Sequence, residues 1–283
     1  MIRTVQRMLA ELRQLTNQNY DESAFQSNFE MTALNDGQDI VCDKILDENP
    51  YMLSTYYDLT LTGEERYYLP DSTPFNYNTI LMLEDITGGA TSPSRTINTI
   101  WMDRMEYHEN NIVTDKLVWS IRDNYIEFPN QETSMTVRIW YSKKPTGLFY
   151  GTAQAGSSTS VTLPTTATAG EVLIDNDVYI GMKIYSANQV RRITDYVGST
   201  KVATITPAWT TNPSTGTIEL ISPLPDAYQQ LMVAEAARII KIANSDDDTQ
   251  IGRYIVEREA MMRKRIARPV VGEPEYIRKI GRL

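Results

Sequence analysis

The sequence predicts an α+β protein, a helical bundle with β-hairpins that also carries an inserted small all-β barrel or sandwich domain. Apolar residues repeat every three to four positions near both ends of the chain, but every second position from residue 56 onward. The composition changes at residue 151, since 26 of the next 71 residues are Ser, Thr or Gly and only nine are charged. Such a stretch, broken by turn residues, is typical of a separate β-rich unit.

Four segments have the helical period. The first lies within residues 1–16, and the second covers residues 28–48 and ends before Pro50. The third, residues 226–243, is apolar almost all round, and its alanines would let neighbouring backbones approach closely. We therefore expect it in the centre of the bundle. The fourth helix follows the turn at residues 244–248 and stops before Pro269.

The region between the second and third helices alternates apolar and polar residues, as strands do. We predict hairpins at residues 57–69 and 117–129, single strands at 79–85 and 135–141, and a short helix at 100–108. Within the Ser/Thr/Gly-rich part, five short strands are predicted, at residues 160–163, 178–185, 190–195, 201–206 and 217–220.

These elements suggest three parts. Residues 1–150 and 222–268 would form the helical and hairpin core, and residues 151–221 an inserted β-domain. Residues 269–283, with two glycines and two prolines, are expected to be extended and to become ordered only on a partner.

The composition excludes several classes of protein. With 283 residues, 41% of them hydrophobic and 22% charged, the chain can bury an ordinary core. The single Cys42 excludes a disulfide framework, and the single His108 excludes a multi-histidine metal site. No apolar run approaches the roughly 20 residues of a membrane helix, and residues 1–16 lack the apolar block of a signal peptide. We expect a protein kept in the cytoplasm or in a particle assembled there.

Charge is distributed unevenly along the chain. Nine basic and four acidic residues give residues 253–283 a net charge of +5, which leaves −14 for residues 1–252. The acidic majority argues against general affinity for nucleic-acid phosphates. The basic end is expected to meet an acidic partner, although a solvated helix face followed by a frayed terminus is the alternative.

No pattern of residues predicts an enzyme, a metal site or a cofactor site. His108 lies in a polar stretch, where a surface or capping role fits better than catalysis. The run Asp246-Asp247-Asp248 lacks the alternate spacing of a calcium loop, so helix capping is the better account. No pair of carboxylates stands out for glycoside hydrolysis.

Tyrosines are numerous, at 17, and several gather between the second helix and the first predicted hairpin. Because a tyrosine combines an apolar ring with a polar tip, such a cluster suits a strand face that becomes a subunit interface. Ordinary cross-strand packing is the alternative. The cluster is Tyr51, Tyr56, Tyr57, Tyr67 and Tyr68.

Five short motifs occur in a fixed order in the helical and hairpin segments. They are Leu34-Asn35-Asp36-Gly37-Gln38-Asp39-Ile40-Val41, Tyr67-Tyr68-Leu69-Pro70, Tyr125-Ile126-Glu127-Phe128-Pro129, Val137-Arg138-Ile139-Trp140-Tyr141-Ser142-Lys143-Lys144-Pro145 and Leu224-Pro225-Asp226-Ala227-Tyr228. In this order they resemble the head-to-tail adaptor, or connector, proteins of tailed bacteriophages, which dock beneath the portal. The resemblance covers residues 1–145 and 222–268.

The inserted segment resembles a β-module that recurs in phage structural proteins. The likeness is carried by residues 193–205 with Pro207-Ala208-Trp209, and by the openings at residues 151–153 and 179–182. Residues 186–189 depart from it, because such modules often have a glycine-rich turn there.

The resemblance implies a non-enzymatic ring of twelve copies in the virion neck, between portal and tail. DNA would pass through the ring without sequence-specific binding, and an acidic wall would not retain it. The partners would be the portal protein, other tail or neck proteins and further copies of the chain itself, with no cofactor. The basic end would dock on the portal through Arg265, Arg268, Tyr276, Ile277, Arg278, Lys279, Ile280, Arg282 and Leu283.

A second hypothesis is a tail-associated protein that binds a receptor or glycan, or decorates the particle, through the inserted β-domain. Its candidate surface is a set of aromatic residues, although core packing explains them equally well. They are Tyr179, Tyr185, Tyr196 and Trp209.

Overall fold

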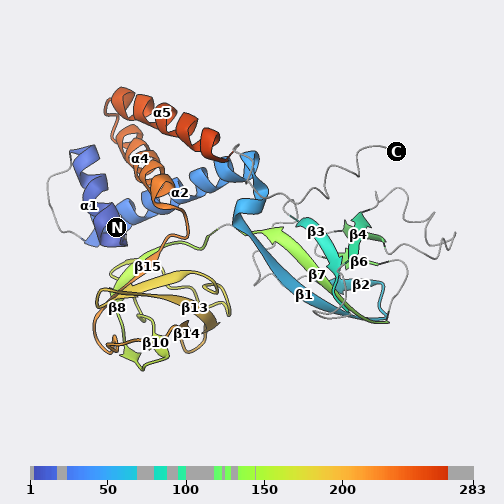
Figure 1. Cartoon of the computed structure of the whole chain (residues 1–283). Coiled ribbons are helices and arrows are strands. Elements are labelled where there is room, and N and C mark those ends of the chain that lie inside the picture. Colours follow the sequence, from blue (N-terminus) through green and yellow to red (C-terminus); the bar gives the residue numbers. More distant parts are fainter. Residues whose placement is uncertain are drawn as a thin grey trace. The chain divides into compact units, whose positions relative to one another are not determined.

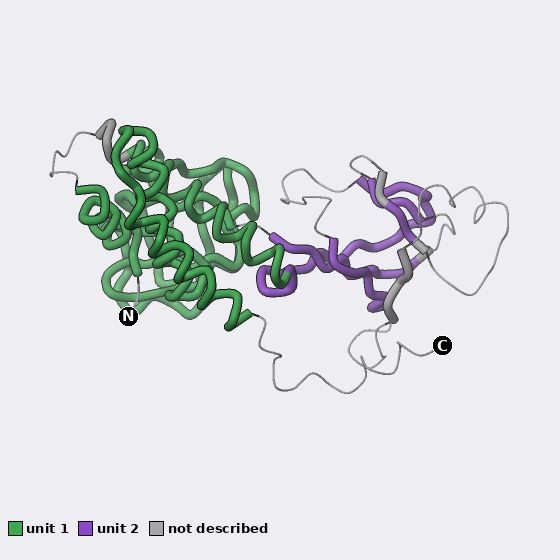
Figure 2. Tube along the Cα trace, turned by 90° about the horizontal axis from the view of Figure 1, so that it is seen from above, with its two compact units in different colours: residues 1–49, 145–283 green, residues 50–144 purple. Residues whose placement is uncertain are grey.

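The structure, a computed structural model, divides the chain into two compact units (Figure 2). The first unit consists of residues 1–49 and 145–283, and the second of residues 50–144. Helices and antiparallel sheets are both extensive, so the predicted α+β class is confirmed. The residues that the structure describes are 3–17, 24–68, 80–87, 95–99, 118–122, 125–128, 133–143 and 145–266.

Four helices of the first unit lie together on one side of its sheet (Figure 1). They are α1 (Val5–Thr16), α2 (Ala24–Glu48), α4 (Asp226–Ala243) and α5 (Thr249–Ile266). All four were predicted, and α2 begins four residues earlier than its periodicity suggested. Helix α4 contacts the other three helices, as expected of a central helix. Among the described helices, none is both long and apolar enough to cross a membrane.

Helices α2 and α4 cross with their backbones in close contact at Gly37. A Cβ atom at this position would lie 2.5 Å from the carbonyl oxygen of Met232 and 3.3 Å from the Cβ of Ala236. Glycine is therefore required here by the approach of the two helices rather than by its backbone angles. The alanines of α4 allow the same approach from the other side, which agrees with the sequence prediction.

The sheet of the first unit has eight strands, in the order β11-β8-β15-β12-β13-β14-β10-β9, and all its pairs are antiparallel. The strands are β8 (Phe149–Thr152), β9 (Ala155–Gly156), β10 (Ser160–Thr162), β11 (Ala169–Gly170), β12 (Lys183–Ser186), β13 (Gln189–Val197), β14 (Val202–Thr206) and β15 (Thr217–Ile221).

One of the five strands predicted in this region is mostly a turn. Residues 178–182 precede β12 as turns, and the N–H of Met182 donates to the carbonyl oxygen of Tyr179. The reason is the ring of Tyr179, which is fully buried, with its hydroxyl accepting the N–H of Leu173 at 2.8 Å. The chain turns here to insert this ring into the core.

The second unit contains a short 3-10 helix, η1 (Pro50–Leu53), and a seven-stranded sheet with the order β1-β7-β3-β4-β5-β6-β2. Among the described residues, its strand pairs are antiparallel except for β4 with β5, which are parallel. The strands are β1 (Ser54–Thr62), β2 (Arg66–Tyr68), β3 (Ile80–Asp85), β4 (Arg95–Thr99), β5 (Val118–Arg122), β6 (Tyr125–Glu127) and β7 (Thr133–Ser142).

The core of the second unit is formed by side chains that alternate along these strands. It consists of Leu61, Tyr67, Leu83, Trp119, Ile126, Phe128, Val137, Ile139 and Tyr141. The predicted strands at 79–85 and 135–141 are confirmed as β3 and β7, and the hairpin at 117–129 is confirmed as β5 and β6. The predicted helix at 100–108, with His108, lies outside the described residues.

The hairpin predicted at residues 57–69 does not form. Strand β1 pairs with β7 along almost its whole length, and β2 pairs with β6, so the two strands lie at opposite ends of the sheet order. The turn between them is held instead by Tyr67, whose hydroxyl accepts the N–H groups of Thr62 and Glu64 at 2.8 and 3.0 Å.

The units divide the chain differently from the predicted domains. The inserted β-region belongs with the helices, and the hairpin region forms the second unit. The reason is a set of polar contacts between helix and sheet. The Asn35 amide accepts the N–H of Leu148 at 2.8 Å, and the Gln38 amide donates to the carbonyl oxygen of Thr146 at 3.2 Å. Composition alone does not indicate such contacts.

Candidate functional site

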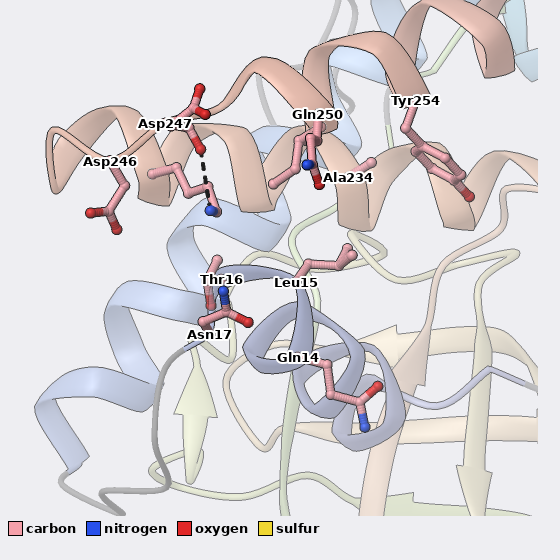
Figure 3. Close-up of a pocket in the computed structure, with 11 residues that line it drawn as sticks. Gln14, Leu15, Thr16, Asn17, Ala234, Asp246, Asp247, Gln250 and Tyr254 are labelled. Atoms are coloured by element: carbon pink, nitrogen blue, oxygen red, sulfur yellow. Dashed lines mark hydrogen bonds between the residues drawn. The ribbon is translucent and has the colours of Figure 1, made fainter.

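A groove in the first unit lies between the end of α1, the end of α4 and the start of α5 (Figure 3). Its volume is about 720 Å³. The side chains that line it are mainly polar and come from all three helices. They are Gln14, Leu15, Thr16, Asn17, Ala234, Lys241, Asp246, Asp247, Gln250, Ile251 and Tyr254.

The charged groups of this groove stabilise the start of α5. The carboxylate of Asp247 accepts the N–H of Thr249 at 2.9 Å and its hydroxyl at 2.6 Å, and these hydrogen bonds lower the pKa of Asp247. Lys241 donates to the carbonyl oxygen of Asp247 at 3.2 Å. The capping role predicted for the acidic run is therefore confirmed at Asp247.

A charge cluster joins three helices of the same unit. Lys44 of α2 forms ion pairs with Glu235 of α4 and Glu259 of α5. Burial lowers the pKa of Lys44, but the hydrogen bonds with the two carboxylates outweigh this effect and leave the pKa above its ordinary value. A lysine that holds its proton so firmly is a structural cation rather than a nucleophile. Among the described residues, no group of three or more His, Cys, Asp or Glu could hold a metal ion.

The second unit presents a cluster of aromatic and charged side chains on β1, β3 and β7, which we call the aromatic face: Tyr56, Asp58, Glu84, Arg138 and Trp140. Tyr56 lies opposite Trp140 in the strand register, with ring centroids 5.3 Å apart. The guanidinium of Arg138 lies over the Tyr56 ring, 3.9 Å from its centroid, and donates two hydrogen bonds of 2.8 Å to Asp58. The indole N–H of Trp140 donates to Glu84 at 2.9 Å.

Tyrosines concentrate on the exposed surface of this unit. Among the described residues, the tyrosines with more than about two-fifths of their surface exposed are Tyr51, Tyr56, Tyr68 and Tyr125, all within residues 50–144. Tyr68 and Tyr125 pair across β2 and β6 with ring centroids 5.4 Å apart. Tyr67, which precedes Tyr68, is buried in the core. The predicted tyrosine cluster thus divides between core and surface by the alternation of the strands.

Three of the four surface residues predicted in the inserted β-region are buried. Tyr179 and Tyr196 are almost completely buried, with ring centroids 4.9 Å apart, and burial raises the pKa of both hydroxyls, that of Tyr196 to about 12. Trp209 is 4% exposed. Only Tyr185 reaches the surface, where its hydroxyl donates to Asn188 at 2.8 Å. The small sheet uses these large rings to fill its core, so they form no binding surface.

The predicted docking residues fall mostly outside the described residues, which end at Ile266. Arg265 is described and is exposed on the last turn of α5. We call the side chains around it the basic end of α5: Met261, Arg263, Lys264 and Arg265. Arg263 pairs with Glu48 at 3.1 Å, whereas Lys264 and Arg265 have no ion-pair partner among the described residues.

Of the aromatic face, only Tyr56 was expected at an interface from the sequence, as a member of the tyrosine cluster. The signal was present, because Arg138 and Trp140 alternate with buried Val137 and Ile139 along one predicted strand. What was missing was the partner strand that supplies Tyr56 and Asp58, which lies about 80 residues earlier in the chain.

No protein-family model matches the chain, and no curated protein matches its sequence.

Proposed function

We propose that the chain is a subunit of a non-enzymatic connector ring, a structural protein of the virion neck that joins the portal to the tail and extends the DNA channel. In this proposal the four helices form the bundle, and the eight-stranded sheet is the inserted barrel or sandwich domain. The portal, other neck or tail proteins and further copies of the chain are its partners.

The observation that carries the proposal is where the connector-like motifs lie in the fold. The run Leu34–Val41 contains Gly37, at which α2 and α4 cross. The run Leu224–Tyr228 opens α4, the helix in contact with the other three. The run beginning at Val137 lies in β7, which pairs with both β1 and β3. Because these motifs lie at helix crossings and strand pairings, they support a similarity to connector proteins in overall architecture rather than at one local site.

The last described helix supports the predicted docking role of the segment that follows it. Helix α5 ends in three exposed basic residues, Arg263, Lys264 and Arg265, immediately before residues 267–283. Acidic charge dominates residues 1–252, whereas residues 267–283 carry four basic and two acidic side chains, so this segment is the part that an acidic portal surface would attract. A short basic and apolar segment binds weakly by itself, but repetition around a ring would multiply the weak contacts.

The acidic composition supports a channel through which DNA slides. A protein retains DNA mainly by exchanging Lys and Arg for the counterions of the phosphates, and a net charge of −9 offers little such exchange. The receptor-binding alternative has lost its supporting observation, because Tyr179, Tyr196 and Trp209 are buried.

Removing the docking segment tests the proposal. We expect a variant that lacks residues 271–283 to remain folded and soluble, because the described helices and sheets end at residue 266. It should no longer bind the portal protein of the same virus in co-sedimentation, and DNA-filled heads should remain open. A matched control keeps the segment but replaces Glu273 and Glu275 with Gln, which should preserve binding. Normal completion of heads by the truncated chain would count against the docking role.

A further inference from the structure

The aromatic face has the composition of a protein-binding surface. Tyr, Trp and Arg are the residue types most enriched where binding energy concentrates, and Tyr56, Trp140 and Arg138 lie together on adjacent strands. Tyr56 is half exposed although its ring is large. Removing the exposed parts of these rings from water would favour binding in proportion to the apolar area covered.

Four polar side chains of this face are already hydrogen-bonded to one another. Both carboxylate oxygens of Asp58 accept from Arg138, and Glu84 accepts from Trp140. A partner that covers the face leaves these hydrogen bonds in place, which lowers the desolvation penalty. The Tyr56 hydroxyl and the second carboxylate oxygen of Glu84 have no hydrogen bond to a described residue, so both can accept one from a cationic partner. The same pairing leaves few free donors or acceptors for a sugar or another ligand bound by hydrogen bonds. The face thus fits a protein surface that offers apolar contact.

The net charge of the aromatic face determines which kind of protein surface it would bind. Asp58 and Glu84 outnumber Arg138, so a cationic partner is favoured. This chain carries such a surface at the basic end of α5. Met261 there is 53% exposed, and a flexible methionine adapts well to aromatic rings. Lys264 and Arg265 beside it lack ion-pair partners among the described residues.

We propose that copies of this chain contact one another head to tail, with the aromatic face of one copy against the basic end of α5 of the next. The inference rests on the proposed ring and names the contact that builds it. Because the two surfaces differ, a row of copies always has a free aromatic face on the copy at one end and a free basic end of α5 on the copy at the other end. Copies therefore add until the rotation between them closes a ring.

Disulfide trapping tests this contact. The natural Cys42 is fully buried, so engineered thiols at the surface would react without competition from it. Thr60 is exposed on β1 and, two residues from Asp58, lies on the same side of the sheet. Ala260 is exposed on α5, four residues before Lys264. Neither substitution removes a residue of either surface.

We expect the double variant Thr60→Cys/Ala260→Cys, assembled with the portal and then oxidised, to give a ladder of linked copies on a denaturing gel. Each single variant should remain one copy, because neither position faces itself across a head-to-tail contact. The matched control Thr60→Cys/Ser199→Cys places the second thiol at an exposed turn outside both surfaces and should give no ladder.

Native mass measurement of the same samples before oxidation separates the possible failures. Rings that form but give no ladder would overturn the proposed contact and leave the connector function standing. Linked dimers from either single variant would show a two-fold contact and overturn the head-to-tail arrangement. Absence of any ring in the presence of the portal would overturn both proposals.

Discussion

Glu219 shows how a single carboxylate joins the two layers of the first unit. It lies on β15, is 3% exposed, and accepts the backbone N–H of Gln6 at 2.9 Å, in the first turn of α1. Negative charge is favourable at a helix N-terminus. Burial nevertheless raises the pKa of Glu219, because it opposes the charged form more than the hydrogen bonds favour it.

Glu219 should make stability depend on pH in a direction unusual for a carboxylate. Its raised pKa means that the folded state holds the proton more tightly than the unfolded state. Its contribution to stability is therefore present below the ordinary carboxyl pKa of 4.5 and is lost as the pH rises through the raised pKa. Relative to Glu219→Gln, the natural protein should lose free energy of unfolding as the pH rises above 4.5.

Urea unfolding at several pH values measures this difference. The exposed Glu171, in the same unit, provides the control variant Glu171→Gln, which removes a carboxylate that is not buried. If the free energy of unfolding of the natural protein minus that of Glu219→Gln stays constant, or decreases as the pH falls, burial does not dominate at this carboxylate.

The aromatic residues show that residue type alone does not determine whether a side chain is buried or exposed. Tyr179, Tyr196 and Trp209 were assigned to a surface and fill a core, whereas Tyr56 and Tyr68 are exposed. An amphipathic ring suits both places, and the choice depends on which side of a strand or turn faces the core. Alternation correctly separates Tyr67 from Tyr68. It could not place Tyr179, because the chain turns there instead of continuing as a strand.

At the scale of elements, the local pattern of apolar residues was enough to predict the helices but not to predict which strands pair. The four helices were predicted because the period of apolar residues is contained in each segment. The partner of β1 could not be predicted, because β7 lies far along the chain and competes with the adjacent β2. The long and nearly continuous register with β7 offers more hydrogen bonds than the three-residue β2 could provide.

The crossing of α2 and α4 gives a prediction for two glycines. Gly37→Ala would bring a Cβ atom into the backbone of α4, so it should lower the free energy of unfolding by about 1–3 kcal/mol. Gly252 provides the control, because a Cβ atom there meets nothing within 4 Å and alanine favours the helix. Gly252→Ala should raise stability by about 0.5–1 kcal/mol. Denaturant unfolding compares the two, and equal effects of the same sign would contradict the close crossing.

For the whole molecule, the change of composition at residue 151 lies close to a boundary between the two compact units, at residues 144 and 145, but the β-rich part that follows belongs to the same unit as the helices. Side chains of α2 hydrogen-bond the backbone at Thr146 and Leu148, so the sheet that follows packs with the helices. These contacts join residues more than 100 positions apart, and composition carries no information about them. The β-rich character of residues 151–221 was predicted, whereas its attachment was not.

The observed boundary predicts that the second unit can be removed. Residues 50 and 142 lie side by side, since the hydroxyl of Ser142 donates to the carbonyl oxygen of Pro50 at 2.8 Å. A short Gly-Ser linker in place of residues 50–144 should therefore leave the first unit folded. We expect one cooperative urea transition and a retained helical circular dichroism signal. Loss of the cooperative transition would show that the helices need the hairpin region, as the predicted domains required.

The central claim is that this chain assembles into a ring on a portal. Native mass measurement of the purified chain, alone and mixed with the portal protein of the same virus, tests it most directly. The account predicts a complex that contains the portal and a full ring of this chain, twelve copies by the connector resemblance, whatever the state of the chain alone. A mixture in which the chain stays separate from an intact portal would contradict the account.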